Sequence, residues 1–249
     1  MKKIISVIAF AVFCLGLFAQ IQWQEQGISV RQGVNIEWSR AAAPVDDGYI
    51  IYVWSDTRRG DRDLWAQKIG EDGNLIWGEN SSHPQYPTMK EGTLVNGEIN
   101  RQEDPVVIDI GDGEVIIAWV DFRHEDTGDI YAQKLNTDGE VQWEEEGVPL
   151  CLAGDVQISL NIVNDTEGGA YLIWLDSRNP GGVDIYGTHI LSSGEIADGW
   201  DEDGNPIADF EGSQDQHTFW EDGYGGAILA WRDTRVPTDE NIYMQRITS

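Results

Sequence analysis

Four copies of a Trp-x-Asp-x-Arg motif form the most regular set of polar side chains in this chain. On an extended strand the three named residues lie two positions apart and share one face. A carboxylate and a guanidinium at this spacing can form part of a binding site or can hold each other as an ion pair, in which arginine offers a bidentate fork. The four copies are nearly identical, whereas binding sites usually lie where loops differ, so we interpret them as structural pairs between and within repeats. The motif residues are Trp54, Asp56, Arg58, Trp119, Asp121, Arg123, Trp174, Asp176, Arg178, Trp231, Asp233 and Arg235.

Few other residues are spaced for catalysis or metal binding. The four histidines do not follow a metal-binding spacing such as His-Glu-x-x-His, and the sequence has no Gly-x-Ser-x-Gly nucleophile motif. The acidic run 201–205 is similar to part of a calcium loop, but it lacks the distal glutamate of such loops. We therefore expect no cofactor and no catalytic residue, with calcium as the alternative. Carboxylates are so numerous that no single glycosidase pair stands out.

The motif recurs at an interval of about 55 residues, which indicates a repeat architecture. Each repeat contains four strand-like runs. The second run, as in Val115–Trp119, is continuously apolar, so both of its faces are expected to be buried. Pro105–Asp109 precedes it, and Asp129–Leu135 follows and ends in an Asp-Gly turn, a strong hairpin signal. The fourth run carries Trp77, Trp143 or Trp200 and is more polar, as an outer edge strand should be.

These repeats predict an all-β fold, a four-bladed β-propeller. The segment Ile21–Val30 matches the fourth run of a repeat, and the last repeat reaches Ser249 after only its third run. We therefore expect the N-terminal strand to complete the last blade and close the ring, which hides two sheet edges. The first repeat is the longest, because Gly78–Asp104 is expected to be a polar loop insertion.

The repeat sequence Trp-x-Asp-x-Arg…Asp-Ile-Tyr-Ala-Gln…Asp-Gly…Trp resembles that of exported bacterial β-propeller repeat proteins. The turn Asn136-Thr-Asp138-Gly139-Glu-Val-Gln-Trp143 also resembles, more distantly, the Asp-box of sialidase-type propellers, although here Gly directly follows Asp. The first resemblance implies a propeller fold across the whole mature chain and an exported protein. An Asp-box is a turn that stabilises the fold, so this likeness implies nothing about sialidase activity.

Composition and the N-terminus indicate an exported protein. Residues 1–19 read as a signal peptide, which leaves 20–249 as one domain of four repeats. The formal net charge of −28 becomes more negative once Lys2 and Lys3 are removed, and so acidic a surface disfavours nucleic acid. We expect a secreted, periplasmic or cell-surface monomer that is not inserted in a membrane. Cys151, the single cysteine left after cleavage, is expected to be a small buried hydrophobe.

The loops that differ between repeats are the candidate ligand surface. In a propeller the loops after the second and fourth strands open on one face, and there four side chains stand out: Arg59, Arg62, Tyr86 and His124. We expect a non-catalytic binding or scaffolding module for a protein or glycan. The alternative is a carbohydrate-active enzyme, glycosidase- or sialidase-like, on the same fold. Exposed, non-repeated carboxylates or arginines around the central funnel would favour the enzyme.

Overall fold

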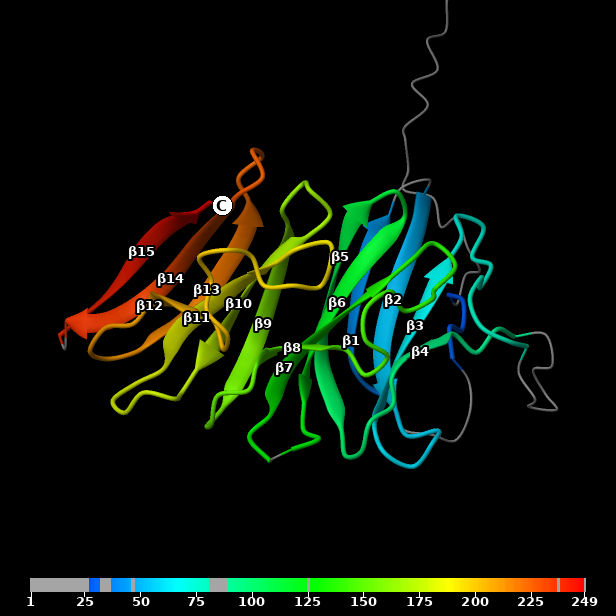
Figure 1. Cartoon of the computed structure of the whole chain (residues 1–249), viewed down its shortest axis with the longest axis horizontal. Coiled ribbons are helices and arrows are strands. Elements are labelled where there is room, and N and C mark those ends of the chain that lie inside the picture. Colours follow the sequence, from blue (N-terminus) through cyan, green and yellow to red (C-terminus); the bar gives the residue numbers. More distant parts are fainter. Residues whose placement is uncertain are drawn as a thin grey trace, which may run out of the picture.

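The computed structural model describes residues 27–31, 37–45, 48–80, 89–124, 126–236 and 238–248. These residues form fifteen strands in four antiparallel sheets, and they contain no α-helix. The first three sheets have four strands each and the last has three (Figure 1). The strands are β1 (Glu37–Val45), β2 (Tyr49–Asp56), β3 (Asp63–Ile69), β4 (Thr93–Asn96), β5 (Gln102–Gly111), β6 (Glu114–Asp121), β7 (Asp129–Leu135), β8 (Val148–Cys151), β9 (Gln157–Asn164), β10 (Ala170–Asp176), β11 (Asp184–Ile190), β12 (Asn205–Ala208), β13 (Gln214–Glu221), β14 (Ala227–Val236) and β15 (Asp239–Ile247).

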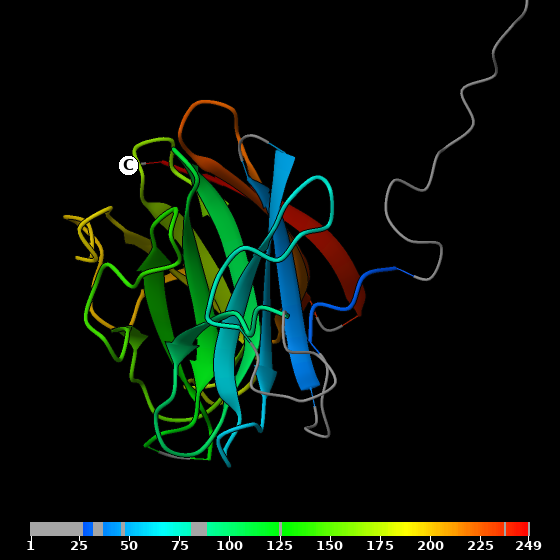
Figure 2. The same ribbon diagram turned by 90° about the vertical axis from the view of Figure 1, so that its right-hand side faces the viewer.

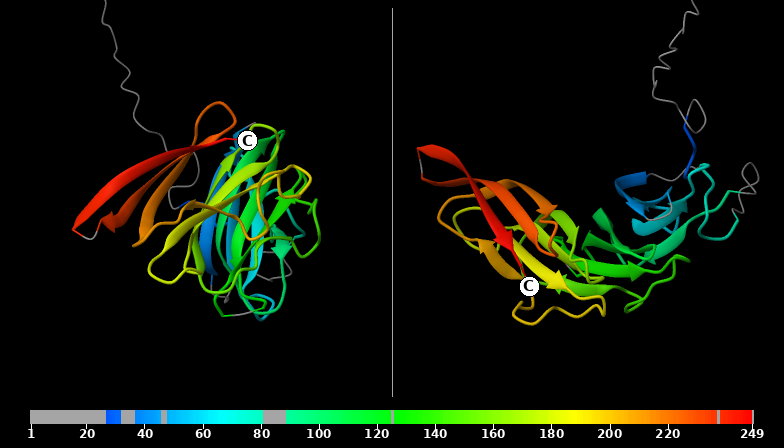
Figure 3. Two further views of the ribbon diagram at one scale, coloured as in Figure 1. Left: turned by 60° about the vertical axis from the view of Figure 1, so that its left-hand side comes forward. Right: turned by 90° about the horizontal axis from the view of Figure 1, so that it is seen from above.

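Each sheet is one repeat, and its strands follow one another in chain order, so we call the sheets blades 1 to 4. The first strands of successive blades, β1, β5, β9 and β13, lie beside one another. We call them the inner strands. Figure 2 looks along the row of blades from blade 1, and the view from above in Figure 3 shows the blades following an open arc.

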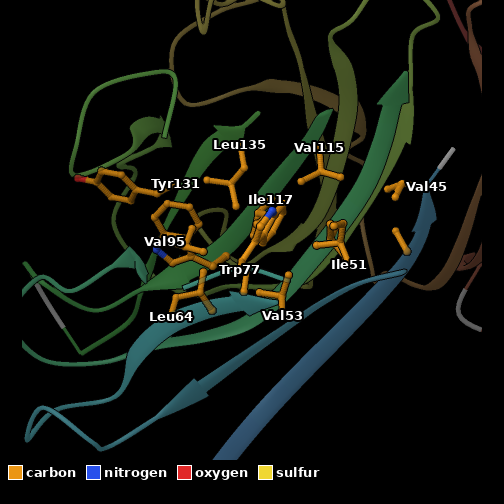
Figure 4. Packing of buried hydrophobic residues seen from close by; sticks show 14 residues of the cluster. Val45, Ile51, Val53, Leu64, Trp77, Val95, Val115, Ile117, Tyr131 and Leu135 are labelled. Carbon is orange, nitrogen blue, oxygen red and sulfur yellow. The ribbon is translucent and has the colours of Figure 1, made fainter. Parts of the chain in front are cut away.

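The second strands of the two middle blades, β6 and β10, are buried on both faces, as their apolar sequences predict. In β6 every residue from Val115 to Asp121 is buried. In β14 of blade 4, buried and partly exposed residues alternate instead, so the prediction is wrong there. One face of each blade, which we call the Trp face, carries the motif tryptophan, and in blades 2 to 4 it packs against the preceding blade. The other, the trailing face, packs against the following blade in blades 1 to 3. Figure 4 shows this packing between blades 1 and 2, where Ile51 and Val53 meet Ile117.

The prediction that Trp77 and Trp143 lie on the fourth strands is wrong. The fourth strands β4 and β8 begin later, and both tryptophans lie in the segment that leads to them. The Trp77 indole donates from Nε1 to the Thr137 carbonyl of the next blade at 3.0 Å, and its ring lies where a Cβ on Gly139 would stand. These tryptophans therefore pack between blades instead of pairing along an outer edge.

The prediction of a loop insertion at Gly78–Asp104 is also partly wrong, because this segment contains β4 and the start of β5. Ring closure stays a prediction. The described part of the N-terminal segment, residues 27–31, is not a strand, and nothing lies within 4 Å of the place where a Cβ on Gly27 would stand. Residues 20–26 lie outside the described part of the chain.

Candidate functional site

The Trp-x-Asp-x-Arg motif forms a closed hydrogen-bonded corner in every blade. In blade 2 the Trp119 indole donates to Asp121 Oδ2 at 2.8 Å, and Arg123 donates to the same carboxylate from its backbone N and from Nε at 2.9 and 3.0 Å. The guanidinium also stacks on the Tyr131 ring, 4.0 Å from its centroid, and donates to the Glu146 carbonyl at 2.9 Å. The loop after the second strand is thus tied to the start of the fourth strand within the same blade.

The corner carboxylates accept hydrogen bonds on both oxygens, and in blades 1 and 4 these bonds lower the pKa. Burial raises the pKa of Asp56, but hydrogen bonds from Arg58 and Trp54 outweigh it and lower that pKa below the usual value. In blade 4 the side-chain hydrogen bond from Arg235 is the largest influence and lowers the pKa of Asp233 to about 2. All four motif aspartates are inaccessible to solvent. We conclude that the corners stabilise the blades and do not form a ring of free ligands.

The four residues predicted to bind a ligand are not brought together as one group. Arg59 lines a peripheral cavity of about 480 Å³ between blades 1 and 2, together with Glu98, Glu145 and Glu146. His124 is exposed, with Nε2 lying 3.3 Å from the Tyr131 hydroxyl. Tyr86 lies outside the described residues. Arg62 lies elsewhere, in a second cavity of about 330 Å³ that Arg101 and Asn100 also line.

A bulge interrupts the pairing of every inner strand at the same place. The register to the second strand shifts after Glu37 in β1, after Glu103 in β5, beyond Ile158 in β9 and after Asp215 in β13. In three of the bulges a non-glycine residue has positive φ: Asp104 at 49°, Ser159 at 58° and Gln216 at 48°. Bulges and strained residues of this kind are over-represented near active sites, where they redirect side chains.

The side chains at these bulges are not repeated. The residue that follows the partner of the motif aspartate is Trp38 in blade 1, Glu103 in blade 2, Ile158 in blade 3 and Asp215 in blade 4. The next residue along the chain is Ser39, Asp104, Ser159 or Gln216. This variation among otherwise similar repeats contrasts with the identical motif corners.

Around the bulges of blades 1 and 2, polar and aromatic side chains meet. The Arg62 guanidinium lies 3.7 Å from the centroid of the Trp38 ring and forms an ion pair with Glu103. Arg101 lies 3.6 Å from the same carboxylate and 3.7 Å from the centroid of the Phe122 ring. Ser39 Oγ donates to Asp104 Oδ1 at 2.8 Å across the two inner strands. We call Trp38, Ser39, Arg62, Arg101, Glu103 and Asp104 the inner-strand cluster.

The cluster offers two carboxylates with different surroundings. Glu103 is partly buried between two guanidiniums, an environment that keeps a carboxylate charged. Asp104 is exposed beside Ser39 and is held at its place by a strained backbone. Trp38 leaves 43% of its surface exposed. An exposed indole, two arginines and two carboxylates can together bind and polarise a polyhydroxylated ligand.

Only Arg62 of this cluster was singled out by the sequence. The other members, Trp38, Ser39, Arg101, Glu103 and Asp104, were missed, because they neither repeat between blades nor lie in the loops that differ most. An alignment of the four repeats could have found them, because the residue types differ between repeats at the start of each first strand. There the buried Gln102, Gln157 and Gln214 are followed by unlike residues.

The expectation for Cys151 has a structural outcome. Cys151 is buried and free, as predicted, and burial raises the pKa of its thiol to about 12. In the acidic run, Asp203 Oδ1 accepts a hydrogen bond from the Leu152 amide at 2.6 Å. Within the described residues no group of three or more His, Cys, Asp or Glu side chains is arranged to hold a metal ion. Nor does that part of the chain include a helix with the length and apolar character needed to cross a membrane.

No protein-family model matches the sequence, and no curated protein matches it. Among solved structures, the chain is similar to an α-L-arabinofuranosidase from Fusarium graminearum in complex with an iminosugar inhibitor, at 10% identity and a TM-score of 0.50; the match covers 84% of this chain and 62% of the other. It also matches an endo-arabinase from Bacteroides thetaiotaomicron at 14% identity and a TM-score of 0.49, covering 85% of this chain and 75% of that one. A third match is a family 117 glycoside hydrolase from Zobellia galactanivorans, at 10% identity, 87% and 72% coverage and a TM-score of 0.48.

The fold is of the β-propeller type. At these identities the likeness extends to the fold alone, and it does not support the specific Asp-box resemblance. The chain spans less than two thirds of the arabinofuranosidase, so the neighbour is the larger molecule.

Proposed function

We propose that this protein is a carbohydrate-active enzyme of the glycoside hydrolase type, with its site at the inner-strand cluster. The alternative expectation from the sequence is thus preferred to the non-catalytic module. The observation that carries the proposal is the pair of non-repeated carboxylates, Glu103 and Asp104, at a strained bulge beside an exposed tryptophan. The structural neighbours that are named as glycosidases support the same choice.

The residues of the cluster suit the parts of glycoside hydrolysis. Most such enzymes use two carboxyl groups, one of which transfers a proton while the other acts as nucleophile or base. Glu103 forms ion pairs with Arg62 and Arg101, and we assign it the second role. We assign proton transfer to Asp104, the exposed carboxyl group beside it. Trp38 presents an apolar ring on which a sugar face can stack.

The substrate class that we propose is a glycan with arabinofuranose units, by analogy with the neighbours alone. The test is hydrolysis of arabinan, arabinoxylan and an aryl α-L-arabinofuranoside by the chain from Gln20 onward. Changing Glu103→Gln or Asp104→Asn should each reduce the rate by roughly 10²–10⁴-fold, the usual contribution of an acid–base group. Glu140→Gln, an exposed carboxylate in the turn after β7, is the matched control and should leave the rate unchanged.

A binding module is the second candidate, favoured by the stacking of Arg62 on the half-exposed Trp38. In that case a glycan in the gel would retard the wild-type protein in affinity electrophoresis, and the protein would not cleave that glycan. Trp38→Ala would abolish the retardation. Hydrolysis that survives both carboxylate changes would refute a catalytic site at the cluster. We also propose export of the mature chain, which the acidic surface and the N-terminal sequence support.

A further inference from the structure

Among the described residues, the trailing face of blade 4 is apolar and exposed. Every other trailing face is buried by the following blade, and the positions can be matched through the strand registers. Ile242 pairs with the residue after the motif tryptophan, as Leu64, Ile130 and Ile185 do in blades 1 to 3. Those three side chains are inaccessible to solvent, whereas Ile242 is 74% exposed.

The neighbouring positions of this face show the same contrast. Met244 corresponds to Ala66 and Ala132, which are fully buried, yet it is 65% exposed. Trp220 corresponds to the buried Val163 and is 55% exposed. Soluble monomers rarely leave large apolar residues gathered on one face, and such a patch indicates an interaction surface.

The face that is complementary to this one lies at the other end of the arc, on blade 1. On the Trp face of blade 1, Tyr52 and Trp65 are half-buried and Ala42 is exposed. Their counterparts in blade 2 are Ile117, Tyr131 and Val107, and all three are buried against blade 1. Within the described residues, blade 1 thus has a Trp face that is covered at Trp54 but partly open around Tyr52, and blade 4 has an exposed trailing face.

We propose that these two faces join two copies of the chain, with blade 1 of each copy packed on blade 4 of the other. The proposal continues an interface that the chain already forms three times, between blades 1 and 2, 2 and 3, and 3 and 4. The ends of the arc stand apart in Figure 3, so blade 1 of the same chain does not cover blade 4 there. In the proposed pair the head-to-tail contact occurs twice, so that each exposed face meets its complement on the other copy.

This arrangement departs from the monomer expected from the sequence. It also differs from closure of the ring within one chain, which would bury the same two faces. The two arrangements give opposite oligomeric states, because a closed single chain is a monomer and the joined pair is a dimer.

The test is the mass in solution of the chain from Gln20 onward, measured by light scattering and sedimentation velocity over a range of micromolar concentrations. The wild-type protein should be a dimer. The double variant Ile242→Glu/Met244→Glu should be a monomer with an unchanged circular dichroism spectrum, because both side chains are exposed in the single chain. Ile99→Glu, at a side chain 65% exposed in the loop between β4 and β5, is the control and should remain dimeric.

A complementation experiment decides which faces meet. Ala42→Glu on blade 1 should also give a monomer. A mixture of the Ala42→Glu and the Ile242→Glu/Met244→Glu proteins retains one intact pair of faces, so it should regain a dimer, while neither protein does so alone. A monomeric wild-type protein at every concentration would overturn the proposal, as would a dimer that the blade 4 variant leaves intact.

Discussion

The motif corners and the inner-strand bulges differ in what they repeat. At each corner a tryptophan and an arginine donate to one buried aspartate with nearly the same geometry in all four blades. At each bulge the backbone shifts at the same place, but the side chains are unlike. A contact that every blade needs in order to fold is the same in every copy, whereas a site needs several different groups around one ligand. We therefore assign stability to the corners and propose that the chemistry lies at the inner-strand cluster.

The largest stability effect is expected at the centre of a corner. Trp119 is inaccessible to solvent between blades 1 and 2, so Trp119→Ala leaves a cavity and should lower the free energy of unfolding by about 3–5 kcal/mol. Thermal or urea unfolding measures the change. A melting temperature equal to that of the wild type would show that the blades are not packed through this residue.

A smaller effect is expected where Trp77 packs between blades. Gly139 has φ of 81°, and a Cβ there would lie 2.7 Å from the Trp77 ring, so Gly139→Ala should cost about 1–3 kcal/mol through overpacking and strain. Gly111→Ala is the control, because φ is 95° there but nothing lies within 4 Å. If urea unfolding showed the same loss of unfolding free energy for both variants, backbone strain alone would be responsible and the contact with the Trp77 indole would be unimportant.

Acid should weaken the corners, and blade 4 gives the clearest pH window. The pKa of Asp233 is about 2 in the folded protein and about 3.8 when unperturbed. A pKa that is lower in the folded than in the unfolded state stabilises the fold at pH values above the unfolded-state pKa. This contribution is lost as the pH falls from about 4 towards 2. Asp233→Asn should lower the melting temperature at pH 7 and reduce its decline over that window. If the melting temperature of the variant fell as steeply with pH as that of the wild type, Asp233 would be excluded as a source of the acid sensitivity.

The sequence predicted the repeats, the buried second strands and, residue for residue, the third strand β7, because each depends on a local apolar pattern. It misplaced Trp77 and Trp143, since a tryptophan packed on the next blade and one on a strand edge look alike along the chain. It also missed Glu103 and Asp104. These residues matter because they contact blade 1, and those contacts depend on the bulge in β5 and on how blades 1 and 2 are placed relative to each other.

The cluster should be nearly irrelevant to stability. Glu103 pairs with arginines whose side chains are 28% and 37% exposed, and ion pairs near the surface contribute about 1 kcal/mol or less. Glu103→Gln keeps the shape of the side chain and should leave the melting temperature almost unchanged. A loss as large as that of Trp119→Ala would mean that the cluster is another structural corner.

The central claim is tested most directly by measuring stability and glycan hydrolysis on the same preparation of Glu103→Gln. The account predicts a melting temperature close to that of the wild type together with a rate on arabinofuranose substrates that is lower by roughly 10²–10⁴-fold. An unchanged rate with an unchanged melting temperature would contradict it, because Glu103 would then serve neither the chemistry nor the fold.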